Sequence, residues 1–167
     1  MNKKLLAKLK KIKLLVLDFD GVLTDNKVIV SEDGKELVVC DRSDSLGIDM
    51  LKKIMSVIVI SKETNNVVKK RCDKLKIKCY DATDDKISKL ANVAKEMGVE
   101  MENVCYIGND INDLACLKKV GFGVAVANSY PTILSAADYV TKNKGGDGAV
   151  REVCDILLEV HNYKIIS

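Results

Sequence analysis

The chain has few of the residues on which several common chemistries depend. Its 167 residues include a single histidine, His161, and a single proline, Pro131. One histidine excludes a histidine-based catalytic triad and a zinc site with several histidines. With one proline and no Ser/Gly-rich stretch, nothing marks an interdomain linker, and the length fits one domain. Acid–base chemistry must therefore come from carboxylates or lysines.

Disulfide motifs, long apolar runs and a strong charge excess are also missing. The six cysteines form no CxxC pair and nearly all lie in apolar stretches, which predicts reduced, buried thiols. No apolar run is long enough to span a bilayer or to form a signal peptide, so we expect a cytoplasmic protein without a membrane partner. The net charge of +3, from 27 basic and 24 acidic residues, predicts no nucleic-acid partner.

Short apolar runs alternate with amphipathic stretches along the chain. Residues 14–17 are four consecutive aliphatic residues, which predicts a strand buried on both faces. Further strands are predicted at 57–60, 77–80, 104–107, 123–126 and 139–140, and helices at 46–54, 64–75, 84–97, 113–120, 131–137 and 148–160. This alternation predicts an α/β fold with a parallel sheet covered on both faces.

One segment interrupts the alternation. Two short apolar runs, 28–30 and 37–39, flank an Asp-Gly pair at 33–34, which is typical of a β-hairpin. We therefore expect a hairpin insertion over about 25–41 and no separate cap domain. A plain surface ribbon is the alternative, but an isolated hairpin is only marginally stable, which favours packing against something.

Two aspartates stand where the first apolar run stops. On an extended backbone, residues i and i+2 face the same way, so Asp18 and Asp20 can converge just beyond the strand. Gly21 permits the sharp turn that exposes them. Two convergent carboxylates suit a hard divalent cation and covalent phosphoryl chemistry. The alternative is a strand followed by an Asx-rich turn.

Chemically capable residues follow two further strands. Ser61 follows the 57–60 run, and Gly-Asn-Asp at 108–110 follows the 104–107 run. Ligands of open parallel sheets bind outside the carboxyl ends of the strands, and Lys86, at the head of a predicted helix, can reach the same crevice. Together with Asp18 and Asp20 these residues predict a site for a metal ion and a phosphate group.

The same residues resemble the four ordered motifs of the haloacid dehalogenase-like phosphohydrolases. The matching segments are D-F-D-G-V-L-T-D at 18–25, Ser61, Lys86 and G-N-D-I-N-D at 108–113. The resemblance spans nearly the whole chain and implies a Rossmann-like doubly wound parallel sheet. It also implies one phosphatase domain over 1–167, with a C-terminal tail over about 142–167.

The resemblance assigns a role to each motif residue. Asp18 attacks phosphorus and becomes an aspartyl-phosphate, which divides one difficult displacement into two easier ones. Asp20 protonates the leaving alkoxide and then activates water, while its backbone carbonyl contacts Mg²⁺. Ser61 donates a hydrogen bond to the phosphoryl group, and Lys86 pairs with its charge.

The chain departs from the family pattern at the last metal ligand. Relatives often carry an acid at the position of Asn109, so either Asn109 or Asp110 completes the Mg²⁺ site. The preference of Mg²⁺ for carboxylates favours Asp110. Asp113 is expected to hold Lys86 or a metal-bound water, or else to cap the following helix.

The resemblance is closer to the capless branch that contains 3-deoxy-octulosonate 8-phosphate phosphatases and the C-terminal domains of some CMP-acylneuraminate synthetases. It implies a sugar-acid phosphate as substrate. Octulosonate phosphatases usually carry Thr-Gly-Arg where this chain has Ser-Lys-Glu at 61–63, so Glu63 favours the nonulosonate 9-phosphates. Ser45 points the same way, and Arg71 and Lys74 are candidates to meet a sugar carboxylate, with solvated helix positions as the alternative.

Relatives of this short form also suggest an assembly. The resemblance implies a homotetramer in which hairpins pack together and the C-terminal tail, with its glycines at 145–148, lies over a neighbour's site. An ordinary flexible loop is the alternative for those glycines. A non-catalytic oligomerisation module is a further alternative for the chain, although it retains Asp18, Asp20, Ser61 and Lys86. A broad-range sugar-phosphate phosphatase or phosphotransferase is a third possibility.

Overall fold

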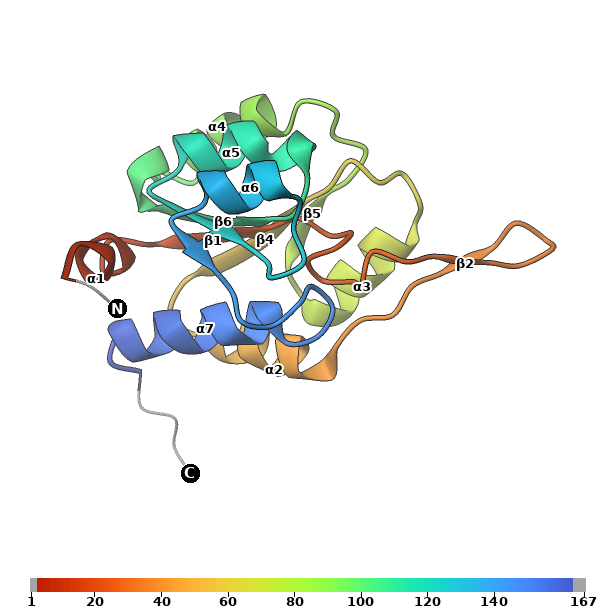
Figure 1. Ribbon diagram of the computed structural model, residues 1–167, viewed down its shortest axis with the longest axis horizontal. Coiled ribbons are helices and arrows are strands. Elements are labelled where there is room, and N and C mark those ends of the chain that lie inside the picture. The colour runs from red at the N-terminus through yellow and green to blue at the C-terminus, as the bar shows by residue number, and fades with distance from the viewer. Residues whose placement is uncertain (1–2, 164–167) are drawn as a thin grey trace.

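A six-stranded parallel sheet forms the centre of the computed structural model, which describes residues 3–163 (Figure 1). Its strands are β1 (Leu14–Leu17), β4 (Ser56–Ile60), β5 (Lys78–Tyr80), β6 (Val104–Gly108), β7 (Phe122–Ala125) and β8 (Tyr139–Val140). They lie in the order β5-β4-β1-β6-β7-β8, and every adjacent pair is parallel. The predicted α/β fold with a doubly wound sheet is confirmed.

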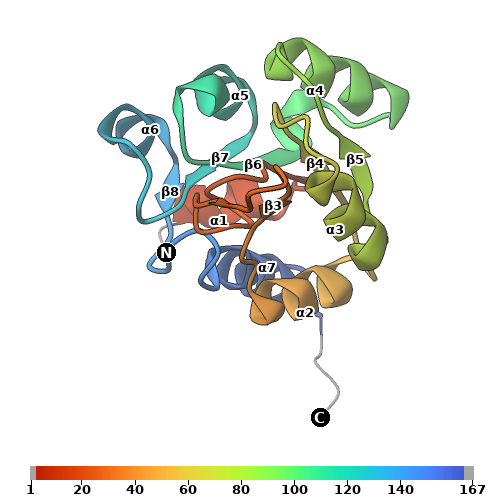
Figure 2. The same cartoon turned by 90° about the vertical axis from the view of Figure 1, so that its right-hand side faces the viewer.

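Helices cover both faces of this sheet (Figure 2). One face carries α4 (Lys86–Glu96), α5 (Leu114–Lys119) and α6 (Pro131–Ala136), and the other α2 (Arg42–Leu51), α3 (Val67–Leu75) and α7 (Ala149–Val160). Alternate residues of β1 belong to the two separate apolar cores, which explains its uninterrupted aliphatic run. The remaining helical elements are α1 (Lys3–Leu9), η1 (Met101–Asn103) and η2 (Ile111–Asp113). Among residues 3–163, no helix combines the length and apolarity needed to cross a membrane.

Helix α2 begins four residues earlier than its apolar spacing predicts. The side chain of Asp41 accepts a hydrogen bond from the Ser43 backbone N–H and so caps the helix at its first turn. In the same turn, buried Asp44 accepts a 2.7 Å hydrogen bond from the backbone N–H of Arg151. This carboxylate therefore joins the start of α2 to the start of α7, which lies beside it under the sheet.

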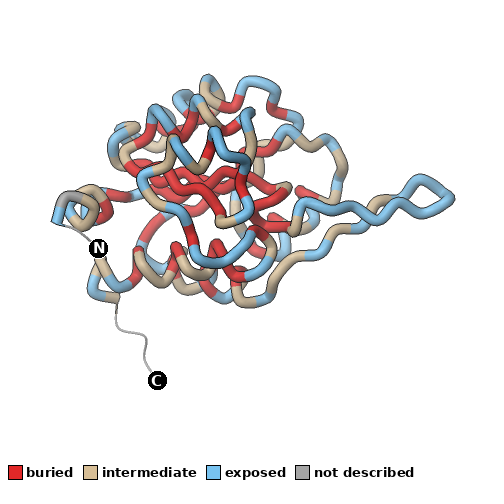
Figure 3. The backbone as a smooth tube through the Cα atoms, in the orientation of Figure 1, coloured by how far each residue is buried: buried red, intermediate tan, exposed pale blue. Residues whose placement is uncertain are grey.

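The hairpin is present and extends away from the sheet. Strands β2 (Ile29–Val30) and β3 (Glu36–Leu37) pair antiparallel, and an isolated bridge between Thr24 and Cys40 closes the base. Most of its residues are exposed, as the pale blue arm of Figure 3 shows. The hairpin therefore contributes little to the core and remains available for contacts at its surface.

The C-terminal segment first returns to the loop after β1. Gly146 N–H donates a 3.0 Å hydrogen bond to the carbonyl of Val22, and Gly145 N–H donates to Asn128 Oδ1. The backbone of these glycines thus packs against its own chain, and the expectation that they also reach over a neighbour's site stays a prediction. Residues 164–167 of the predicted tail lie outside the described residues.

Candidate active site

The sheet register brings the three predicted loops to one edge. Leu17, the last residue of β1, pairs with Val59 on one side and with Ile107 on the other. Residues that follow these strands therefore meet at the carboxyl edge, between β1 and its neighbours. The chain order reverses at this point, since β4 and β5 lie on one side of β1 and β6 to β8 on the other. Such a switch point is where doubly wound sheets bind ligands.

Asp18 is buried at the centre of this edge. One of its carboxylate oxygens, Oδ1, accepts hydrogen bonds from Phe19 N–H at 2.7 Å and forms a 2.8 Å ion pair with Lys86 Nζ. Its other oxygen, Oδ2, has no hydrogen-bond donor among residues 3–163. The carboxylate is thus held firmly through one oxygen and leaves the other available to react.

Lys86 lies between two buried carboxylates. Its Nζ is 2.8 Å from an oxygen of Asp18 and 2.8 Å from Oδ1 of Asp113, and the lysine side chain is 1% exposed. Asp85 caps α4, so Lys86 stands in the first turn, where side chains point back toward the helix start and the sheet edge. Burial alone would lower the pKa of Lys86, but the two carboxylates outweigh it and raise the pKa above its ordinary value. Lys86 therefore stays charged.

Asp113 holds the loop after β6 in place through several hydrogen bonds. Besides Lys86, it accepts a 2.7 Å hydrogen bond from Tyr106 Oη and a 2.9 Å bond from Asn109 N–H. Gly108 makes room for it, because a Cβ there would lie 2.5 Å from the Asp113 Cβ. The expected contact of Asp113 with Lys86 is present. The sequence did not predict the role of Tyr106, because a tyrosine within an apolar run is usually a residue of the hydrophobic core.

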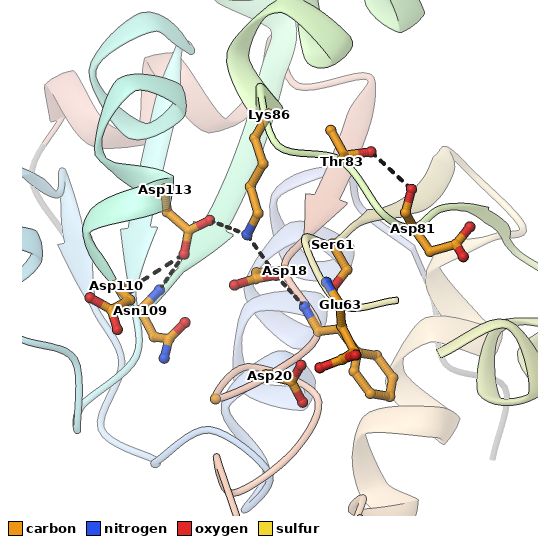
Figure 4. Close-up of polar contacts among 12 residues, drawn as sticks. Asp18, Asp20, Ser61, Glu63, Asp81, Thr83, Lys86, Asn109, Asp110 and Asp113 are labelled. Carbon is orange, nitrogen blue, oxygen red and sulfur yellow. Dashed lines mark hydrogen bonds and ion pairs between the residues drawn. The ribbon is translucent and has the colours of Figure 1, made fainter. Parts of the chain in front are cut away.

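Asn109, rather than Asp110, faces Asp18 and Asp20 (Figure 4). Asn109 Oδ1 is buried and has no hydrogen-bond donor in the described part of the chain. The Asn109 amide also lies against Gly21, where an added Cβ would be 2.1 Å from Nδ2. Gly21 has φ +80°, so this position needs glycine both for its backbone conformation and for the approach of Asn109.

The side chain of Asp110 has a different task. Its Oδ1 accepts a 2.6 Å hydrogen bond from Ile111 N–H and caps η2, and in Figure 4 it lies on the far side of Asn109 from Asp18. The charge argument that favoured Asp110 as a metal ligand overlooked this competing use of its carboxylate. The geometry favours Asn109 for that role.

Asp20 stands at the mouth of the site and is half-buried. Burial raises the pKa of its carboxyl, and the negative charge of Glu63 raises it further. Thr24 lies behind it, 3.5 Å from Asp20 Oδ1, and its hydroxyl also accepts the backbone N–H of Gly21. Thr24 therefore shapes the turn that positions Asp20. The sequence did not predict this role for Thr24. A carboxyl with a raised pKa suits proton donation near neutral pH.

Ser61 directly follows β4, on the other side of Asp18 from the β6 loop. It is almost fully buried, and its Oγ accepts the backbone N–H of Glu63 at 3.1 Å. Its hydroxyl proton has no acceptor within residues 3–163. Ser61 can therefore donate one hydrogen bond to a bound group.

A cavity of about 280 Å³ opens beside Asp20, between the base of the hairpin and the loop after β4. Glu63 lines it, as expected of a substrate-binding residue, together with Glu36 and Lys27. Val67, the first residue of α3, also borders it.

Three other predicted substrate-binding residues lie elsewhere. Arg71 donates to Ser45 Oγ at 2.6 Å and to the carbonyl of Asp41, between α3 and α2. Lys74 is exposed on α3, and none of the three lines the cavity. The Arg71 guanidinium is engaged between the two helices by these hydrogen bonds and does not reach the cavity.

The oxygen atoms at this edge fit a magnesium ion. Asp18 supplies a carboxylate, Asn109 supplies the buried Oδ1 that lacks a partner, and the backbone carbonyl of Asp20 is close by in sequence. Burial raises the pKa of Asp18, which a neighbouring cation would counteract. The described residues contain no group of three or more His, Cys, Asp or Glu side chains placed to hold a metal. A set with so few side-chain ligands suits Mg²⁺, which keeps several waters, better than Zn²⁺.

Comparisons with known proteins identify a family for the chain. A family model of haloacid dehalogenase-like hydrolases matches residues 51–153. The 3-deoxy-D-manno-octulosonate 8-phosphate phosphatase of Escherichia coli (strain K12) is 39% identical over 155 residues, which cover 92% of this chain and 82% of that relative.

Solved structures of such phosphatases match the fold of this chain. The phosphatase of that name from Moraxella catarrhalis, in complex with a magnesium ion, a phosphate ion and KDO, matches with a TM-score of 0.94 at 34% identity, covering 97% of this chain and 94% of that one. The cobalt-bound deoxy-D-mannose-octulosonate 8-phosphate phosphatase from Haemophilus influenzae matches with a TM-score of 0.89 at 32% identity, covering 93% and 92%.

Proposed function

The chain belongs to the haloacid dehalogenase-like hydrolases, and on this basis we propose that it is a Mg²⁺-dependent phosphatase that releases phosphate from 3-deoxy-D-manno-octulosonate 8-phosphate. Family membership and the phosphatase relatives together support a phosphoric monoester hydrolase. The observation that carries the mechanism is the geometry of Asp18, which is held through Oδ1 and leaves Oδ2 without a hydrogen-bond donor among the described residues.

The residues around Asp18 provide a cradle for the phosphate group. Lys86 contributes a charged ammonium group and Ser61 a hydroxyl proton, so both can bind phosphoryl oxygens. Asn109 Oδ1, one oxygen of Asp18 and the backbone carbonyl of Asp20 would hold Mg²⁺. When bound, the ion offsets the repulsion between the carboxylate and the phosphate and stabilises negative charge on the transferring oxygens.

The reaction proceeds in two displacements at phosphorus. In the first, Asp18 Oδ2 forms a bond to phosphorus while the bond from phosphorus to the sugar oxygen breaks. Asp20 gives its proton to the departing alkoxide, a step for which its raised pKa prepares it. In the second, the ionised Asp20 takes a proton from water as the water oxygen attacks phosphorus, and Asp18 leaves as a free carboxylate. Lys86 and Ser61 bind the phosphoryl oxygens throughout.

The choice of sugar rests on the relatives. Curated relatives at up to 39% identity over most of the chain are 3-deoxy-D-manno-octulosonate 8-phosphate phosphatases. The nonulosonate preference that Glu63 suggested receives no support from them. Glu63 does line the cavity beside Asp20, so its carboxylate is well placed to accept hydrogen bonds from sugar hydroxyls of either substrate.

Substrate profiling separates these candidates. Phosphate release is measured with Mg²⁺ for the octulosonate 8-phosphate, a nonulosonate 9-phosphate and a hexose 6-phosphate, with Asp18→Asn as the control for contaminating phosphatase. We expect the highest kcat/KM for the octulosonate. A higher value for the nonulosonate would overturn the choice of sugar, and comparable values across all three would overturn a narrow specificity. No Mg²⁺-dependent release from any of them would contradict the proposal as a whole.

We also propose that the chain forms homotetramers through the hairpin. Five apolar side chains on or beside it are at least half exposed, namely Val28, Ile29, Val30, Leu37 and Val39. A clustered apolar surface on a marginally stable ribbon favours burial against other copies. Ile29→Asp should yield smaller particles by light scattering, whereas Glu32→Lys on the same arm should not. Identical monomers for all three proteins would contradict the proposal.

The proposed enzyme is a single domain that works in the cytoplasm. The six cysteines are all free in the structure, and four of them are buried. Free thiols in this number are typical of a reducing compartment. Cell fractionation with the native protein tests the location, and recovery of activity in an oxidising compartment would contradict it.

A further inference from the structure

We infer that Asn65 is a positioning residue for substrate selection, because it ties the hairpin to the loop after β4 and holds two carboxylates at the wall of the substrate cavity. The inference rests on the proposed function, in that it concerns the part of a hydroxylated phosphate ester that lies beyond the phosphate group. Asn65 itself does not line the cavity, whereas Glu36 and Glu63 do.

Both the nitrogen and the oxygen of the Asn65 side-chain amide have a hydrogen-bond partner. Its Nδ2 donates a 2.9 Å hydrogen bond to Glu36 Oε2 on β3, and its Oδ1 accepts a 3.0 Å bond from Val67 N–H at the start of α3. If the amide were flipped, its NH₂ group would face the Val67 N–H and its oxygen would face the Glu36 carboxylate, and neither pair can form a hydrogen bond. These two partners therefore determine the orientation of the Asn65 amide. The side chain therefore joins two segments that are 29 positions apart in sequence.

The backbone of Asn65 orients the second carboxylate. Glu63 Oε1 accepts the N–H groups of Thr64 and Asn65, both at 2.7 Å. The N–H of Glu63 in turn donates to Ser61 Oγ, so the same loop continues directly into the phosphate cradle. One oxygen of Glu63 and one of Glu36 are thus used by the protein. The remaining oxygen of each carboxylate has no donor within residues 3–163.

The charge of the cavity determines what these free oxygens can bind. Asp20, Glu36 and Glu63 line it with three carboxylates, and Lys27 is the single cation among its lining residues in the described chain. Ionised carboxylates accept hydrogen bonds and repel other anions. The cavity therefore suits a hydroxyl-bearing part of the substrate and excludes a substrate carboxylate from this position. Loss of the Asn65 contact would free β3 and Glu36 to move away from Glu63, because most residues of the hairpin arm are exposed.

The test uses one substitution at two adjacent positions. Asn65→Asp removes the donor to Glu36 and adds a charge that repels it, while the acceptor for Val67 N–H remains. Asn66→Asp makes the same change at an exposed neighbour whose side chain caps nothing. Glu36→Gln keeps an acceptor oxygen for Asn65 and serves as the conservative variant. Full-length variants are assayed with the octulosonate 8-phosphate and with p-nitrophenyl phosphate, which has no sugar hydroxyls.

We expect Asn65→Asp to raise KM for the sugar phosphate at least tenfold while kcat/KM for p-nitrophenyl phosphate stays within twofold of the unmodified enzyme. Asn66→Asp should leave both substrates unaffected, and Glu36→Gln should fall between the two. An equal loss with both substrates would overturn the inference, since it would mean that Asn65 acts on the catalytic loop as a whole. An unchanged KM would overturn it as well.

Failure of the proposed function gives a different result. If the unmodified enzyme cleaves p-nitrophenyl phosphate but no octulosonate phosphate, the assigned substrate is wrong. The selectivity of Asn65→Asp is then judged with the best hydroxylated phosphate of the profile, and a loss confined to that substrate still supports the role of Asn65. Thermal melting of each variant verifies the fold, and Glu36→Gln decides the case if Asn65→Asp does not fold.

Discussion

Replacing Asn109 by alanine should weaken magnesium binding, whereas replacing Asp110 by asparagine should not. Asn109 Oδ1 is buried without a hydrogen-bond donor in the described residues, so Asn109→Ala removes no hydrogen bond at that oxygen. Loss of this oxygen should therefore affect cation binding more than the stability of the metal-free fold. Mutating a residue that only hydrogen-bonds to a metal ligand typically lowers metal affinity by roughly 10–100-fold. Loss of a magnesium ligand itself should lower the affinity by at least as much. This corresponds to about 1.4–2.8 kcal/mol of binding free energy.

Asp110→Asn provides the matched comparison. The asparagine oxygen can still accept the Ile111 N–H that Asp110 now accepts at 2.6 Å, so the start of η2 should be preserved. The charge that is removed lies outside the proposed ligand set, and a solvent-screened charge contributes at most about 1 kcal/mol. We therefore expect the half-saturating Mg²⁺ concentration to change severalfold at most.

Two measurements distinguish these variants. Magnesium is titrated in phosphate-release assays at saturating substrate, and its binding to the substrate-free protein is followed by calorimetry. The second measurement separates a binding defect from a catalytic one. The reasoning is refuted if Asp110→Asn loses as much affinity as Asn109→Ala, or if Asn109→Ala binds the ion as well as the unmodified chain.

Three further outcomes follow from buried groups. Lys86→Met should lower kcat by about 10²–10³-fold and destabilise the metal-free fold by about 3–5 kcal/mol, since two buried carboxylates lose their partner. Lys95→Met on the same helix is the control, and equal kinetics for the two variants would contradict the role of Lys86. Burial raises the pKa of Asp44 from 3.8 to about 6, so the folded chain holds a proton that the unfolded chain releases, and the free energy of unfolding falls as pH rises between those values. Asp44→Asn should therefore gain up to about 3 kcal/mol relative to the unmodified chain between pH 4 and pH 7 in urea unfolding, and parallel curves would show that this group does not titrate there. Gly21→Ala forces a side chain into φ +80° and against Asn109, which should lower the free energy of unfolding by about 1–3 kcal/mol and weaken Mg²⁺ binding; an unchanged melting temperature would count against that contact.

The parts of the fold that could be predicted are those that short-range patterns determine. The aliphatic run of β1 and the aspartates that follow it indicate a buried strand that ends in a polar loop, and the structure contains both. Ser61 and the β6 loop reach the same edge because all six strands are parallel, which alternation of strands and helices already implies. Boundaries were less predictable, since the Asp41 cap begins α2 well before its first apolar residue.

The parts that could not be predicted depend on side-chain direction and on contacts between distant segments. Charge alone favoured Asp110 over Asn109, but the local cap that turns Asp110 away follows from the loop conformation. Tyr106 appears in sequence as one more core residue, and only the fold places its hydroxyl on Asp113. The contact between Asn65 and Glu36 joins a hairpin to a loop, and no spacing rule relates those two positions.

The central claim is that Asp18 carries the phosphoryl group during turnover. Borohydride reduces an acyl-phosphate, so enzyme quenched with it during turnover of the octulosonate 8-phosphate should contain homoserine at position 18, detectable by peptide mass spectrometry. We predict this product in the presence of substrate and Mg²⁺ and its absence when either is withheld. Steady turnover with unmodified Asp18, or modification at Asp20 instead, would contradict the account.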